Sequence, residues 1–73
     1  MRLTEQQVNL IRDTFHSRTL NPKQIKMAQF CREQNLDYNM FYFWATGRMP
    51  AFKMAAEFEK ALQRYFGIEL EER

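Results

Sequence analysis

Apolar side chains recur at α-helical spacing along most of the chain. The interruptions divide it into four predicted helices, over residues 4–17, 22–34, 38–46 and 50–66. In the first helix, Val8, Ile11 and Phe15 fall on one face. Thr4 precedes them and has Gln7 three residues later, which is the pattern of a capping box at a helix start. The spacing therefore predicts an all-α fold.

The second helix is predicted to begin at Pro22, with Asn21 as its N-cap. Proline suits a first helical position, because the backbone donor that it lacks would be unpaired there. Met27, Phe30 and Cys31 give this helix an inward face, and it is predicted to end near residue 34.

A tight turn is predicted between the second and third helices, at Asn35-Leu36-Asp37. Asparagine tolerates the left-handed backbone conformation that a sharp helix stop requires. Leu36 can fill the corner between the helices, and the Asp37 carboxylate can accept from the free amides of the next helix. The two helices are thus predicted to be held close together.

The third helix carries Phe41 and Trp44 three residues apart, so both can face the core. Met40 and Ala45 are expected beside them, and Gly47 is expected to end the helix. Residues 38–44 also have the aromatic composition of a strand. The cap, the apolar spacing and the glycine together favour a helix.

The fourth helix is predicted to place Phe58 and Leu62 on its inner face and to end at a left-handed Gly67. Only residues 68–73 follow, which are too few for another full helix. Ile68 and Leu70 would then need apolar cover. We expect a second copy of the chain to supply it.

Composition and charge narrow the class of protein. A chain of 73 residues suits one small domain, here residues 1–73, and it holds seven Phe, three Tyr and one Trp for its core. There is no apolar run long enough for a membrane span and no secretory-signal pattern at the start, so a cytoplasmic protein is expected. The formal charge is +2, but residues 16–53 hold six basic and two acidic side chains, which favours a polyanionic partner.

The predicted turn and its neighbours also carry a family resemblance. The residues that match it are Phe30, Cys31, Asn35, Leu36, Asp37, Phe41, Trp44, Gly47 and Pro50. The pattern resembles the Cro/repressor-like (XRE-type) helix-turn-helix proteins of phages and bacteria. Where the family commonly has Ala, Gly and Ser, this chain has Cys31, Asn35 and Asp37. Each of these residues is small and allows the same backbone conformation as the residue that it replaces.

The resemblance implies a small lambda-repressor-like domain of four helices, with a fifth as the open alternative and the helix-turn-helix at about residues 22–47. It implies a transcriptional regulator, in most cases a repressor, in the cytoplasm of a bacterial or phage-infected cell. Such a protein binds double-stranded DNA as a homodimer on an inverted repeat, with the third helix in the major groove.

The outer face of the third helix supplies the candidate base-reading residues, which are Tyr38, Asn39, Tyr42 and Phe43. The Asn39 amide can form two hydrogen bonds to an adenine, and the aromatic rings can contact thymine methyl groups. Some of these rings could instead belong to the core or to a dimer surface. Because this face has no arginine, DNA shape is expected to supply part of the specificity.

Candidate phosphate contacts flank that helix. They are Lys23, Lys26, Thr46, Arg48 and Lys53. Phosphate contacts dominate the affinity of proteins for DNA, and the resemblance places such contacts at these flanks. The alternative for each lysine is an ordinary solvated surface position.

Catalytic, cofactor and metal sites are not expected, and neither is a small-molecule substrate. Cys31 fits a small buried hydrophobe, and His16 has no acidic or cysteine partner at ligand spacing. Two other functions remain open. The aromatic face of the third helix could bind a protein, such as a larger repressor or a polymerase subunit, or the chain could be an antitoxin.

Overall fold

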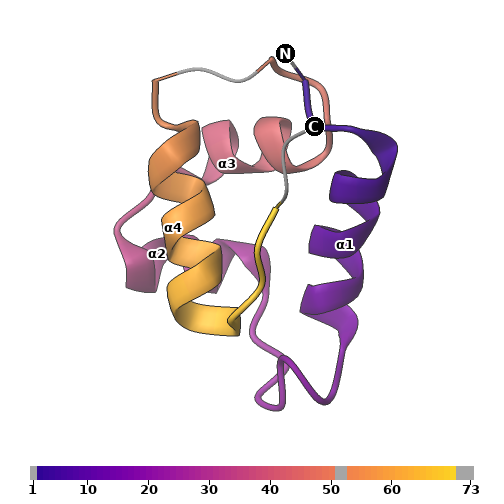
Figure 1. Ribbon diagram of the computed structural model, residues 1–73. Helices are drawn as coiled ribbons and strands as arrows, with labels where there is room; N and C mark the ends of the chain where they lie inside the picture. Colours follow the sequence, from indigo (N-terminus) through magenta and orange to yellow (C-terminus); the bar gives the residue numbers. More distant parts are fainter. Residues whose placement is uncertain (1, 51–52, 71–73) are drawn as a thin grey trace.

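The computed structural model describes residues 2–50 and 53–70. They form four helices, which are α1 (Glu5–His16), α2 (Met27–Gln34), α3 (Tyr38–Ala45) and α4 (Ala55–Phe66) (Figure 1). The described residues contain no strand, and the only extended pairing among them is an isolated bridge between Arg2 and Pro50. The predicted all-α, four-helix fold is confirmed.

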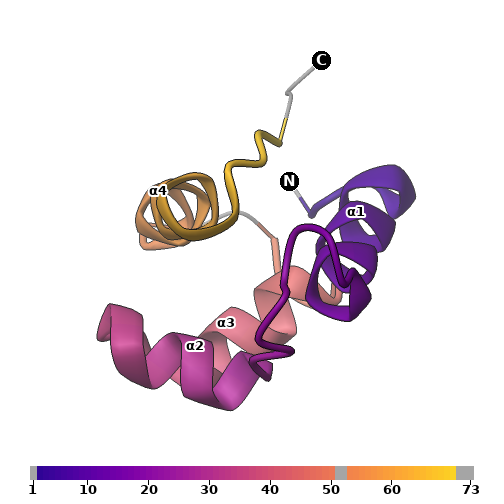
Figure 2. The same ribbon diagram turned by 90° about the horizontal axis from the view of Figure 1, so that it is seen from below.

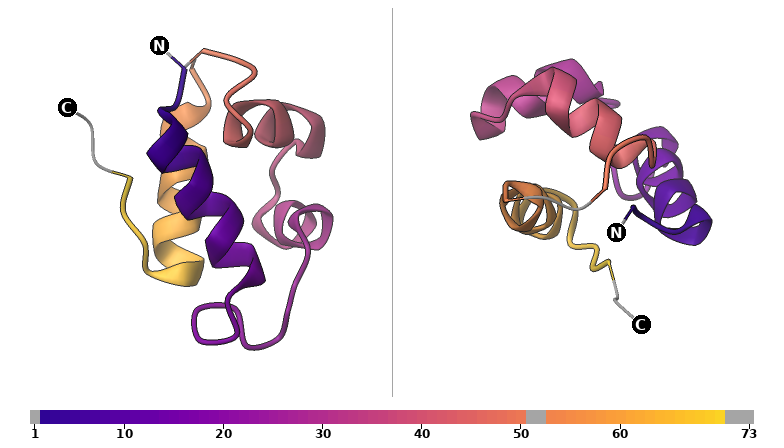
Figure 3. Two further views of the ribbon diagram at one scale, coloured as in Figure 1. Left: turned by 90° about the vertical axis from the view of Figure 1, so that its right-hand side faces the viewer. Right: turned by 90° about the horizontal axis from the view of Figure 1, so that it is seen from above.

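The helices enclose one core. In Figure 2, α2 and α3 lie together on one side of the molecule, whereas α4 and the segment that follows it lie on the opposite side. The right view of Figure 3 shows α1 on the other side of the core from α4, and the left view shows the loop from α1 to α2 at one end of the molecule. One side of α3 therefore faces the core and the other faces away from α4.

Aromatic rings fill the centre of this core. Phe30 of α2 is fully buried, and its ring centroid lies 5.5 Å from that of Phe15, 5.5 Å from Phe41 and 5.4 Å from Phe66. These rings come from all four helices. Most of the pairs meet edge to face or tilted, which is the arrangement that aromatic quadrupoles favour. Phe30 thus joins α2 and α3 to the rest of the domain.

The first helix begins as predicted. The Thr4 hydroxyl accepts a hydrogen bond from the Gln7 amide at 3.1 Å, and the Gln7 side chain accepts one from the Thr4 amide at 2.8 Å. These two bonds complete the capping box.

The predicted start of the second helix was wrong. Helix α2 begins at Met27, five residues later than expected, and Pro22 lies in a turn. Asn21 does not cap the helix. Its buried side-chain amide donates hydrogen bonds to the carbonyls of Phe15 and Ile25, and so connects the end of α1 to the loop before α2. Its Oδ1 also accepts from the Ile25 amide at 3.1 Å.

The fourth helix also begins later than predicted, at Ala55 rather than Pro50. Pro50 is instead paired with Arg2, and residues 51–52 of the predicted helix lie outside the described residues. The predicted end was right. Gly67 has a left-handed φ of 74°, and its amide donates to the Gln63 carbonyl at 2.8 Å.

The segment after α4 covers the core of its own chain. It runs back between α4 and α1 (Figure 1), where Ile68 is buried and Leu70 packs against the core. A second copy of the chain is therefore not needed to cover these two side chains, and the sequence-based argument for a dimer through them was wrong.

Candidate nucleic-acid interface

The turn between α2 and α3 forms as the sequence predicted. Asn35 adopts the left-handed conformation, with φ 60° and ψ 46°. The Leu36 amide then donates to the Cys31 carbonyl at 2.7 Å, and the Asp37 carboxylate accepts from the Met40 amide at 3.0 Å. Leu36 itself packs against the core. The two helices are thus joined by three residues whose backbone is held by hydrogen bonds.

The inner face of α3 fixes the rotation of the helix about its axis. Phe41 and Trp44 are fully buried, and Ala45 is 2% exposed. The Phe58 ring of α4 lies 5.4 Å from both the Phe41 and the Trp44 rings. Rotating α3 would bring these three side chains into water, so the opposite face is held outward.

The outer face of α3 presents the four predicted base-reading residues. Tyr38 is 42% exposed and Phe43 is 41% exposed, whereas Tyr42 is half-buried. Asn39 is exposed, and its side-chain amide has no hydrogen bond within the part of the chain that the structure describes. The Tyr38 and Tyr42 ring centroids lie 6.0 Å apart, as do those of Tyr42 and Phe43. The structure therefore brings the four together on one accessible helix face.

Arg48 extends this face beyond the end of α3. Its guanidinium carbon lies 5.6 Å from the centre of the Tyr42 ring, a cation–π distance, and the side chain is exposed. The Arg48 and Met49 amides both donate to the Phe43 carbonyl. Arg48 is thus the predicted phosphate contact that the structure places directly against the aromatic face.

Arg2 is a basic residue near this site that the sequence analysis missed. Its Nε donates to the Arg48 carbonyl at 3.3 Å, and the bridge to Pro50 holds the same segment in place. Arg2 and Arg48 are 46 positions apart in the sequence, and no local pattern signals their pairing. The fold therefore adds a second arginine at the end of α3.

Thr46 has no proton free for a phosphate. Its hydroxyl lies 2.7 Å from the Tyr42 carbonyl and 3.3 Å from the Phe43 carbonyl, so its single proton is donated within the helix. A DNA phosphate needs a donor from the protein. The hydroxyl of Thr46 stabilises the end of α3 instead.

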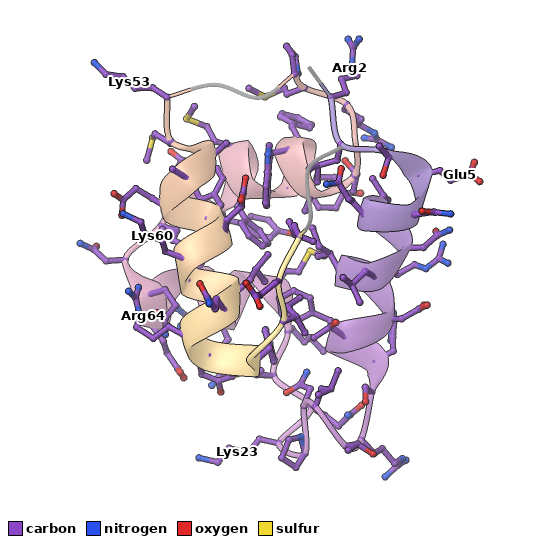
Figure 4. The ribbon with its side chains drawn as sticks, viewed as in Figure 1. Arg2, Glu5, Lys23, Lys53, Lys60 and Arg64 are labelled. Atoms are coloured by element: carbon purple, nitrogen blue, oxygen red, sulfur yellow. The ribbon has the colours of Figure 1, made fainter. Side chains whose placement is uncertain are left out.

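The three predicted phosphate-binding lysines do not form one cluster. Lys26 is exposed at the N-cap of α2, and Lys23 lies in the turn before it. Lys53 lies just before α4. Figure 4 shows Lys23 and Lys53 projecting from opposite ends of the molecule, whose longest extent is 31 Å. Any phosphates that they bind must therefore be well separated.

The described residues contain no cluster of metal ligands, and the Cys31 thiol is not activated. No group of three or more His, Cys, Asp or Glu side chains among them could hold a metal ion. Cys31 is 1% exposed, and burial together with the nearby Asp37 charge raises the pKa of its thiol to about 11. A thiol with that pKa is protonated at neutral pH and a poor nucleophile.

None of the helices in the described ranges is long and apolar enough to cross a membrane. No family model matches the chain, and no curated protein or solved structure is significantly similar to it.

Proposed function

We propose that this chain is a sequence-specific DNA-binding regulator of transcription that reads the major groove with α3. The observation that carries the proposal is the outward face of α3, where Tyr38, Asn39 and Phe43 are exposed together while the opposite face is locked into the core. A side chain that reads a base must be both accessible and rigidly placed. This face meets both conditions.

The dimensions of α3 support the proposal. An α-helix with its side chains is about 10–12 Å across, and the major groove, about 12 Å wide, can admit the eight-residue α3. Because α2 is joined to α3 by only three residues, α2 can cross the DNA backbone while α3 enters the groove, as in a helix-turn-helix. Lys26 at the start of α2 and Arg48 after α3 then lie at the two flanks of the pair.

The proposed regulator is a repressor of the phage or mobile-element type, which acts in the cytoplasm by excluding polymerase from its site. It binds as a homodimer to an inverted repeat. Both points rest on the sequence resemblance. The dimer contact is proposed to form outside the segment at Ile68 and Leu70, because those side chains are covered within one chain.

Selection of bound duplexes from a random DNA pool tests this function. We expect one enriched consensus with two inverted half-sites about one helical turn apart. A pool that returns no consensus, while the folded protein binds every duplex equally, would contradict sequence-specific recognition. A single half-site would contradict the homodimer.

A protein-binding module is the second candidate, and one feature of α3 favours it. The outer face holds three aromatic side chains and no basic residue of its own, and the guanidinium of Arg48 beyond the helix lies over the Tyr42 ring. Exposed tyrosines are common at protein interfaces. Salt distinguishes the two functions, because binding to DNA weakens steeply with salt, whereas binding through an aromatic interface changes little.

A further inference from the structure

A half-open cavity of about 390 Å³ lies at the surface between the end of α1 and the start of α2. Phe15, Ile25 and Met27 supply its apolar wall, and the first two are buried. Arg12, His16 and Lys26 also line it and are exposed, so they form a basic rim. Small-molecule sites commonly have this volume and this division into an apolar body and a few polar groups.

Buried hydrogen bonds hold the two walls of the cavity in place. The Asn21 amide donates to the Phe15 carbonyl at 2.8 Å and to the Ile25 carbonyl at 2.9 Å, so one side chain ties together both walls. Gln24, which also lines the cavity, donates from its side chain to the Asn21 carbonyl at 2.8 Å. The cavity is therefore preformed, and a ligand would not have to order these segments.

The charge around the cavity selects the sign of a ligand. Its lining includes three basic side chains and no carboxylate. Asp13 is the nearest described acid to Arg12, with 3.6 Å between its Oδ1 and the Arg12 Nε, but both side chains are largely exposed and such a pair is weak. The guanidinium of Arg12 keeps other donors for a ligand.

The first turn of α2 adds to this field. Lys26, the N-cap residue, makes no capping hydrogen bond through its side chain, and Met27 begins the helix at the cavity wall. The amides of a first helical turn have no partners within the helix and carry a partial positive charge. The last carbonyls of α1, at the opposite wall, carry the opposite partial charge, so the basic side chains of the rim decide the preference for an anion.

We propose that this cavity binds a small organic anion, a phosphate or carboxylate attached to a compact apolar body. The anionic group contacts Arg12, His16 and Lys26, and the apolar body rests against Phe15, Ile25 and Met27. This site lies apart from the outer face of α3, and the proposal does not depend on DNA binding.

Titration with phenyl phosphate, followed by the NMR shifts of the backbone amides at residues 24–27, tests the proposal. Inorganic phosphate and phenol serve as the two halves of the probe. We expect phenyl phosphate to bind about tenfold tighter than either, because it alone satisfies both the basic rim and the apolar wall. Equal binding of inorganic phosphate would reduce the site to a general anion patch, such as a DNA phosphate would occupy, and would overturn the proposal. Equal binding of phenol would overturn it too.

Single variants of the rim give a second test. Arg12→Gln and Lys26→Gln should each weaken phenyl phosphate about threefold to fivefold, the range expected for exposed charge pairs. Lys60→Gln is the matched control, because Lys60 is exposed on α4 (Figure 4) and does not line the cavity. Thermal melts check that all three fold. Equal affinity in the rim variants and the control would overturn the assignment.

Discussion

Trp44 shows what holds α3 in place. Its side chain is fully buried, yet its indole nitrogen has no hydrogen-bond partner among residues 2–50 and 53–70. A buried donor without a partner costs about 1–3 kcal/mol. The Trp44 ring packs 5.8 Å from the Phe41 ring and 5.4 Å from the Phe58 ring, measured between centroids. Packing therefore has to outweigh the lost hydrogen bond, which makes ring contacts the main restraint on the candidate reading helix.

Asn39 is the residue at which base reading is best tested. Its free amide can bind an adenine edge in two places, so Asn39→Ala should weaken binding to the selected site by about 1–3 kcal/mol and leave binding to random duplex unchanged. Gln63→Ala, on the exposed side of α4, is the control. Fluorescence anisotropy on both duplexes measures the difference. An equal loss on the two duplexes would show that Asn39 does not read bases.

Cys31 should make stability depend on alkaline pH. Burial and the Asp37 carboxylate raise the pKa of its thiol from 9.0 to about 11, so the unfolded chain loses this proton first. Below pH 9 the thiol is protonated in both states, and its contribution is fully present. Between pH 9 and about 11 the free energy of unfolding should fall by up to about 3 kcal/mol.

The comparison with Cys31→Ala isolates this effect, because every other ionisable group is the same in both proteins. Urea denaturation at several pH values measures the difference in slope. Parallel curves for wild type and variant would mean that the folded state does not suppress the ionisation of Cys31.

At the scale of elements, two glycines have the same backbone conformation but different surroundings. Gly67 has φ 74° and open space where a Cβ would be, whereas Gly47 has φ 76° and the Val8 Cγ2 only 3.1 Å from that position. Gly67→Ala should cost about 1 kcal/mol, from backbone strain alone. Gly47→Ala should cost more, because Val8 must also shift. Chemical denaturation of the two variants measures both values, and equal losses would contradict the close contact.

The accuracy of the sequence-based prediction differed between helix ends. Thr4, Asp37 and Gly67 act through neighbours in the sequence, so their caps could be predicted. The start of α2 could not, because the Asn21 side chain bonds to Phe15 at the end of α1 and to Ile25 in the loop, and neither bond caps a helix that begins at Met27.

The residues of the candidate site also differ in whether the sequence could predict them. The outward position of Tyr38, Asn39 and Phe43 follows from helical spacing around the buried Phe41 and Trp44, and it was predicted. Arg2 was missed because only the fold brings it to Arg48. The hydroxyl bond of Thr46 to its own helix is a common alternative for threonine, but spacing alone does not select it over a phosphate contact.

At the scale of the whole molecule, the predicted phosphate contacts are spread along the domain rather than gathered in one patch. Lys23 and Lys53 project from opposite ends of the molecule (Figure 4). Lys26 and Arg48 lie between these two lysines in the sequence. If Lys26 binds a phosphate, Lys26→Ala should lower the slope of log affinity against log salt by about 0.9, with weaker binding to all duplexes. Lys60→Ala on α4 is the control. A slope that matches wild type would remove Lys26 from the phosphate contacts.

The anchoring of Arg2 to Arg48 has a practical consequence for anyone who purifies this protein. An affinity tag fused ahead of residue 2 would begin beside the end of α3, close enough to crowd a duplex or to add histidine charge next to it. Binding measured on such a fusion would report the tag as well as the protein, so the tag should be cleaved before any affinity is recorded.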